Sequence, residues 1–195
     1  MKKKLAIISA LVICAALISG GTLAYFTDAL QVHNVITSGA VKIELVEKTI
    51  NENGTEVVFP KEGLTGMMPG TSASKIVSVR NTGAEAWVRV AVDVEILSSE
   101  GKELPLTVNG EDMITFTVDD TNWIKSDGCY YYKTAVESGK ETEILFDKVH
   151  FAPSMGNEYQ NCTVRIDVSA QAVQTANNPI PAGGNVTDIP GWPQS

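Results

Sequence analysis

Residues 87–96 read WVRVAVDVEI, and this stretch decides the fold class because its side chains alternate between apolar and polar character. Successive side chains of a β-strand point to opposite faces, so one face of this strand is apolar and the other is largely charged. The apolar face holds Val88, Val90, Val92, Val94 and Ile96, and the other holds Arg89, Asp93 and Glu95. A strand with one wet face belongs to an antiparallel sheet.

Two other stretches repeat this alternation, AVKIELVE at residues 40–47 and CTVRIDVSAQA at residues 162–172. Their predicted inward residues are Val41, Ile43 and Leu45 in the first, and Val164, Ile166, Val168 and Ala170 in the second. Shorter runs lie between turn signals such as NENG, NTG and ESGK, and Asp127-Gly128 predicts a tight hairpin turn. About eight to ten short strands without an amphipathic helix predict an all-β fold, a sandwich of two packed antiparallel sheets.

The first 24 residues have the order of a secretory signal: Lys2 to Lys4, an apolar run from Leu5 to Ile18, and then small residues. We expect cleavage between Ala24 and Tyr25. The alternative is a retained membrane helix, because 20 residues are about enough to cross a bilayer. In either case we expect most of the protein to lie outside the cytoplasm.

The charge balance is acidic, with a formal net charge of −8 that becomes −11 over 171 residues once the signal is removed. An acidic exported chain is a poor candidate for binding nucleic acid or anionic membrane surfaces, so we expect membrane contact only through the signal. The remaining length suits one domain.

Two cysteines, Cys129 and Cys162, remain after Cys14 leaves with the signal. In an oxidising compartment they are candidates for one disulfide, which would stabilise the fold by roughly 3 to 4 kcal/mol on the chain-entropy estimate. The alternative is two separate reduced residues in the core.

Composition changes at Gln174, where four of the eight prolines and three glycines fall among polar residues. We therefore predict an irregular, flexible tail over residues 174–195. We expect Trp192 to be solvated in that tail, although a lone aromatic residue can also dock.

Three stretches in one order carry a family resemblance: SGGTLAYFTD at 19–28, NVITSGAVKIEL at 34–45 and MMPGTSASKIVSVRNTG at 67–83. Together with the valine-rich strands that follow, they resemble the TasA and camelysin (CalY) family of exported bacterial proteins. The resemblance extends to about residue 92 and fades between residues 97 and 141. It divides the chain into a signal peptide at 1–24, a joining strand at 25–37, a sandwich domain at 38–173 and the tail.

The resemblance implies cleavage by a signal peptidase of the SipW type, a jelly-roll sandwich, and secretion to the extracellular matrix or cell surface. It also implies self-association, or association with a homologous matrix protein, into biofilm-matrix fibres in which the joining strand of one subunit completes the sheet of its neighbour. Phe26, Leu30, Val32 and Val35 would supply the apolar groups of this strand. The alternative is that the segment folds back onto its own domain as an edge strand.

Camelysin is described as a metalloprotease, so an extracellular metallo-endopeptidase is the main competing function, and a cell-surface binding module is the second. Zinc peptidases need about three protein ligands, and this sequence has only His33 and His150, without an H-E-x-x-H motif. We therefore expect no catalytic, metal or cofactor residues.

Overall fold

The computed structural model describes residues 35–37, 41–60, 68–176 and 178–193, which all belong to one compact unit. The signal, the cleavage positions Ala24 and Tyr25, and the joining-strand residues Phe26, Leu30 and Val32 lie outside these residues. No helix in the described ranges is long and apolar enough to cross a membrane.

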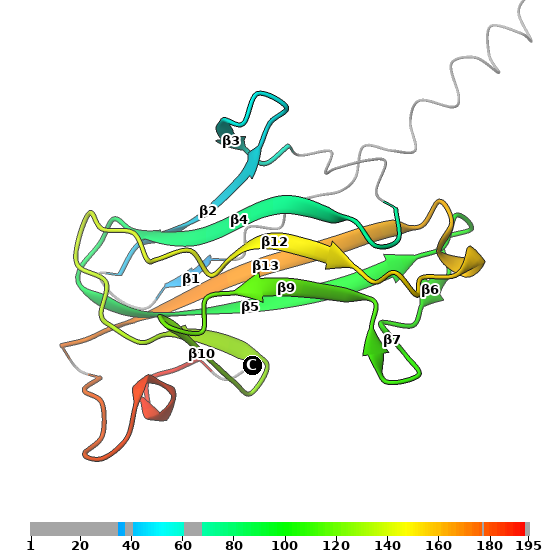
Figure 1. Ribbon diagram of the computed structural model, residues 1–195. Coiled ribbons are helices and arrows are strands. Elements are labelled where there is room, and N and C mark those ends of the chain that lie inside the picture. The colour runs from blue at the N-terminus through cyan, green and yellow to red at the C-terminus, as the bar shows by residue number, and fades with distance from the viewer. Residues whose placement is uncertain (1–34, 38–40, 61–67, 177, 194–195) are drawn as a thin grey trace, which may run out of the picture. The chain divides into compact units, whose positions relative to one another are not determined.

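The described chain forms two main β-sheets that pack face to face, together with a small hairpin (Figure 1). The six-stranded sheet has the order β1 (Val35–Thr37), β13 (Thr163–Gln174), β5 (Ala86–Leu97), β11 (Cys129–Tyr132) and β10 (Trp123–Ser126), with β6 (Glu103–Leu104) beside the end of β5. The five-stranded sheet has the order β3 (Glu56–Val58), β2 (Ile43–Ile50), β4 (Ser72–Asn81), β12 (Phe146–Phe151) and β9 (Ile114–Val118). The small hairpin consists of β7 (Thr107–Val108) and β8 (Glu111–Asp112), and the described helical elements are the 3-10 turns η1 (Asn157–Tyr159) and η2 (Val186–Asp188).

All pairings between these strands are antiparallel except that of β1 with β13, which is parallel. The all-β sandwich predicted from the alternating pattern is therefore confirmed.

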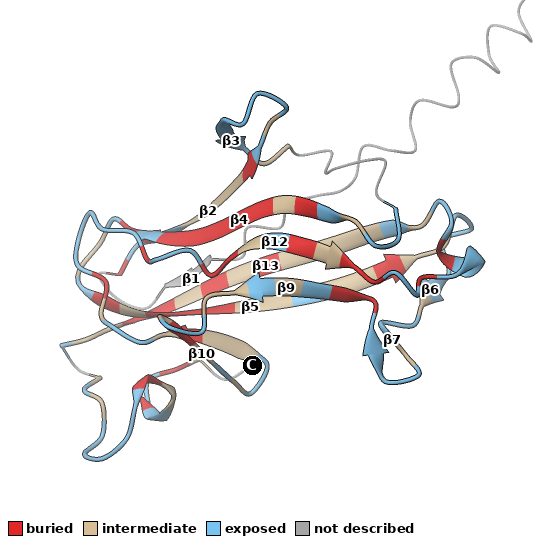
Figure 2. Ribbon diagram, viewed as in Figure 1, coloured by how far each residue is buried: buried red, intermediate tan, exposed pale blue. Residues whose placement is uncertain are grey.

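The core lies between the two sheets and is centred on the long pair β5 and β13, which align from Ala86↔Gln174 to Leu97↔Thr163. The predicted inward residues of both strands fall on the core side, and Val88, Val90 and Ala170 are fully buried there. Val77 and Val79 of β4 complete this layer from the opposite sheet. Figure 2 shows the buried positions concentrated on the strands of the sandwich.

A buried ion pair lies on the core-facing side of the five-stranded sheet. Lys75 and Glu47 pair through their side chains, which are 5% and 7% exposed. Glu47 aligns with core residue Val77, and Lys75 lies two positions before Val77, so both side chains share its face. The Lys75 ammonium also lies 3.9 Å from the centre of the Phe59 ring. This charged pair lies on β2 and β4 between Val77 in one apolar cluster and Ala73 in the next.

The hairpin of β10 and β11 has the predicted turn, because Asp127 (φ 47°) and Gly128 (φ 77°) both adopt positive dihedrals. Tyr130 and Tyr132 pack against the central core, while Tyr131 belongs to a separate cluster on the outer face. Alternation along the strand therefore places Tyr131 on the opposite face from Tyr130 and Tyr132.

The candidate disulfide is not formed, because Cys129 and Cys162 are both free. Cys129 aligns with Ala91 of β5, whereas the residue after Cys162 aligns with Leu97. Six residues along a strand span about 20 Å, and a disulfide needs Cα atoms within about 7 Å. The alternative of two separate, partly buried thiols describes this structure.

The prediction of a solvated Trp192 is wrong. Its side chain is 8% exposed and packs in a cluster with Tyr131 and Val173 on the outer face of the six-stranded sheet. Residues 178–193 are irregular, as expected, but they dock on the sandwich.

Candidate functional site

In the described part of the chain, the outer edge of β13 is paired over only part of its length. Val35, Ile36 and Thr37 of β1 align with Ala170, Gln171 and Ala172, while the other side of β13 pairs with β5 along its whole length. Among the described residues, no strand lies beside residues 163–169 on that outer side. This stretch, which no described strand covers, runs for about 23 Å, and an exposed row of N–H and C=O groups is a template for another strand.

Burial of the core-facing residues decreases along β13 from the part that β1 covers to the open part. Ala170 and Ala172 are fully buried and Val168 is 4% exposed, whereas Ile166 and Val164 are only partly buried. Apolar groups at the rim of a core gain free energy, about 25 cal/mol per Å², when another chain covers them. The open edge therefore offers both hydrogen bonds and apolar surface. We call this edge, residues 163–169, the β13 edge.

The opposite sheet is also partly uncovered on this side of the sandwich, where β2 contacts β13. β3 pairs with β2 at residues 48–50, and the Phe59 amide donates to the Glu47 carbonyl at 3.0 Å, so within the described ranges no strand pairs with residues 43–46 on the side away from β4. Ile50, Val57 and Val58 of this hairpin are exposed apolar residues, with Val58 82% exposed. Figure 1 shows β3 projecting away from the body of the sandwich.

Val35, the last of the predicted joining-strand residues, lies at the start of β1 and aligns with Ala170. The alternative that the segment folds back onto its own domain therefore describes residues 35–37. The other predicted positions lie outside the described residues. No sequence pattern indicated that this segment lies beside β13, because alternation defines the faces of a strand and not the order of strands in a sheet.

A zinc site is not supported by the residues around His150. Its Nδ1 lies 2.7 Å from the Ser72 hydroxyl and its Nε2 lies 2.6 Å from the Thr117 hydroxyl, so both ring nitrogens have neutral hydroxyl partners. Within the described ranges, no three His, Cys, Asp or Glu side chains gather closely enough to hold a metal ion. The donor set at His150 does not fit zinc, which requires about three nitrogen, sulfur or carboxylate ligands. His33 lies outside the described residues.

In its described residues, the protein belongs to the class of antiparallel β-sandwiches, and one of its sheets has an edge that is covered along only part of its length. A family model described as camelysin metallo-endopeptidase matches residues 1–178, and the chain belongs to this family. The predicted family resemblance is thereby confirmed. No curated protein and no solved structure gives a significant match.

Proposed function

We propose that the protein is an extracellular structural subunit that assembles into fibres by strand donation. The part of the joining strand that precedes β1, residues 25–34, extends to the next copy and pairs along the β13 edge there, while residues 35–37 stay on their own β13. The observation that carries this proposal is the β13 edge itself, because no described strand pairs with its backbone beside the partly buried Val164 and Ile166. Strand addition satisfies such backbone groups and places alternate side chains against the core.

The register of β1 relates the joining strand to the open edge. Val35 aligns with Ala170, so each residue of the segment pairs with the β13 residue 135 positions later if the register continues. Residues 28–34 would then align with residues 163–169. The segment has the length that the open edge requires.

If the joining strand of the same chain continued in this register, its apolar side chains would point away from the core and polar ones toward it. Leu30 and Val32 would align with Arg165 and Asp167, on the outer face, and Gln31 would align with the core-facing Ile166. A strand from a second copy is not bound to this register. A shift of one residue turns Leu30 and Val32 toward the core, because the side-chain period of a strand is two. The apolar pattern of the segment therefore favours donation between copies.

Strand donation of this kind is a head-to-tail contact, which does not close on itself and so propagates into a filament. Cleavage between Ala24 and Tyr25 by a signal peptidase of the SipW type would release the end that is donated. An extracellular location agrees with that of the camelysin family.

Electron microscopy of purified mature variants tests the proposal. Deletion of residues 25–34 leaves a copy that can accept a strand but cannot donate one, so we expect no filaments from it alone. Added to the unmodified protein, it should shorten filaments by terminating them.

A matched pair of substitutions on β13 tests the acceptor edge. Ile166→Lys places a charge on the core-facing side of the open edge, whereas Asp167→Lys changes the neighbouring outward position. We expect Ile166→Lys to abolish filaments and Asp167→Lys to retain them, with circular dichroism confirming that both fold. Filaments of unchanged length from the deletion or from folded Ile166→Lys would refute strand donation at this edge.

The family description favours a second candidate, an extracellular metallo-endopeptidase. Hydrolysis of a casein substrate with and without a chelator distinguishes the two. Chelator-sensitive hydrolysis that His150→Ala or His33→Ala abolishes would establish the enzymatic function.

A further inference from the structure

The docked tail, residues 178–193, packs on the outer face of the six-stranded sheet. Val186, Ile189 and Trp192 of the tail are nearly fully buried against Tyr131 and Val173. Trp87, Ile124, Cys129 and Ile180 are partly buried around this cluster. The family match ends at residue 178, so nearly all of the docked tail lies beyond it.

The tail has a defined internal structure. Asn185 and Asp188 form a reciprocal capping box around η2, with the Asn185 side chain accepting from the Thr187 amide at 2.8 Å. The indole N–H of Trp192 donates to the Val186 carbonyl at 2.9 Å, which closes the segment into a loop. Trp192 is thereby held in one orientation toward the sheet.

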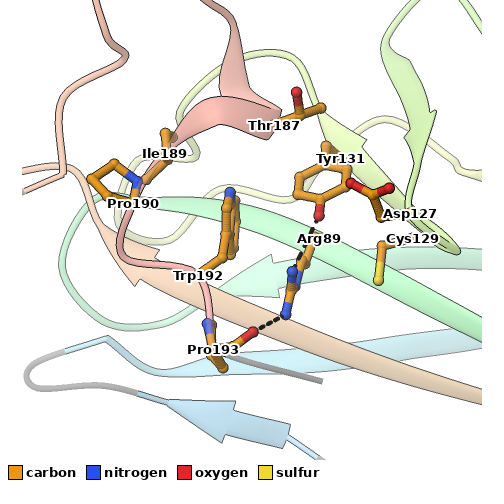
Figure 3. Close-up of a pocket in the computed structure, with 9 residues that line it drawn as sticks. All are labelled: Arg89, Asp127, Cys129, Tyr131, Thr187, Ile189, Pro190, Trp192 and Pro193. Atoms are coloured by element: carbon orange, nitrogen blue, oxygen red, sulfur yellow. Dashed lines mark hydrogen bonds between the residues drawn. The ribbon is translucent and has the colours of Figure 1, made fainter.

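Arg89 links the sheet to the tail, and it is 7% exposed although its position on β5 faces outward. Its guanidinium donates to the Gln171 side chain at 2.8 Å and to the Tyr131 hydroxyl at 3.1 Å, which fixes it from the sheet side. It also donates to the Pro193 carbonyl and lies 5.2 Å from the Trp192 ring (Figure 3). Among the described residues no carboxylate pairs with this buried cation, so the tail carbonyl and aromatic rings surround it.

Gly191 fits closely against Asn178 at the start of the tail. A Cβ atom at position 191 would lie 1.9 Å from the Asn178 side-chain oxygen. Asn178 itself donates to the Gln174 carbonyl at 2.9 Å, and its own carbonyl accepts from the Trp87 indole at 2.8 Å. A side chain at position 191 would therefore have to push the Asn178 side chain out of its bond to the Gln174 carbonyl.

A pocket that is open to solvent lies beside Arg89. Its volume is about 260 Å³, and residues of both the sheet and the tail line it. Its lining residues are Arg89, Asp127, Cys129, Tyr131, Thr187, Ile189, Pro190, Trp192 and Pro193.

We propose that the outer face around Arg89 and Tyr131 is a peptide-recognition site whose occupant is the chain's own Ile189–Pro193 segment, and that the same segment of a second copy can replace it. The sheet supplies the receptor, because Arg89 is positioned by Gln171 and Tyr131. The peptide supplies a tryptophan ring, a glycine at the close contact and a main-chain carbonyl. Exchange of identical segments between copies is a low-cost route to association.

A full-length Trp192→Ala chain tests recognition, because its own tail lacks the ring that fills the site. A fluorescent peptide with the sequence of residues 185–195 should bind this variant saturably in an anisotropy titration. A tethered ligand has a local concentration of about millimolar, so we expect a dissociation constant between about 10 µM and 1 mM. The same peptide carrying Trp192→Ala, and a receptor that also carries Arg89→Gln, should each weaken binding at least about tenfold.

Gly191→Ala provides a second receptor. It retains Trp192 but weakens docking of its own tail, because a Cβ atom at position 191 must push the Asn178 side chain out of its bond to the Gln174 carbonyl. It keeps the proposal testable if Trp192→Ala does not fold. Absence of saturable binding at about 1 mM peptide, to whichever variant is folded, would overturn the recognition site.

Exchange between copies is tested by mixing a Trp192→Ala chain, which has a site without its ligand, with an Arg89→Gln chain, which has a ligand and a weakened site. Both should lack residues 25–34, so that strand donation does not contribute. Sedimentation should detect a heterodimer in the mixture and monomers in each separate sample. Peptide binding without heterodimer formation would overturn the part of the proposal that concerns a second copy.

Discussion

Replacing Lys75 with methionine should destabilise the fold more than any exposed charge substitution, because it removes the buried ammonium that pairs with the Glu47 carboxylate. Both side chains are at least 93% buried, and Met keeps most of the apolar volume of Lys. Breaking a buried pair from one side costs about 3 to 5 kcal/mol. In a chain of this size about 1 kcal/mol corresponds to 2 to 4 °C, so the melting temperature should fall by roughly 10 °C.

Urea denaturation of a double-mutant cycle measures this effect. The double variant Lys75→Met with Glu47→Leu removes both charges and should recover most of the loss, because apolar replacements of buried ion pairs are often neutral or stabilising. Arg165→Met is the matched control, since Arg165 and Glu95 form a pair that is about 40% exposed and should contribute under about 1 kcal/mol. The reasoning is refuted if Lys75→Met costs less than about 1 kcal/mol, or if the double variant loses as much as the single one.

Three further outcomes are expected. Burial acts to raise the pKa of Glu141, but hydrogen bonds from Ser78 and Arg80 and the charge of Arg80 outweigh it and lower the pKa below 4.5. Glu141→Gln should therefore lower the free energy of unfolding at neutral pH. In urea melts at several pH values, the difference in this free energy between the variant and the unmodified protein should disappear as pH falls below 4.5. Reductant should leave the melting temperature of the unmodified protein unchanged, because Cys129 and Cys162 are free, whereas a decrease that Cys129→Ser abolishes would indicate a bridge. Removing divalent metal with a chelator should leave the thermal melt unchanged, and a drop of several degrees would indicate a structural metal.

The alternating pattern was sufficient to predict the sandwich and the core-facing residues, because a strand with one apolar face can bury it in only one direction. Val88 and Val90 of β5 and Val168 and Ala170 of β13 are buried as that pattern predicts. Asp127-Gly128 likewise predicted its own turn, since the backbone dihedrals depend on these two residues alone. Local patterns were therefore sufficient where the cause is local.

The features that sequence patterns missed depend on residues far apart in the chain. Arg89 was correctly predicted to face outward, but the tail residue Pro193, which is 104 positions later, covers it. Trp192 lies in a segment with no periodicity, so no pattern indicated that it docks. The Lys75–Glu47 pair places charge on a core-facing side, and its partners are 28 residues apart. Alternation also could not predict that β1 lies beside β13.

Hydrogen exchange at the backbone amides of residues 163–169 tests strand donation most directly. Those amides of the β13 edge that do not bond to β5 should exchange rapidly in dilute monomer and become protected in filaments, together with the amides of residues 25–34. Amides of the already paired residues 170–172 serve as the internal control and should change little. Equal protection of residues 163–169 in monomer and filament would contradict the account.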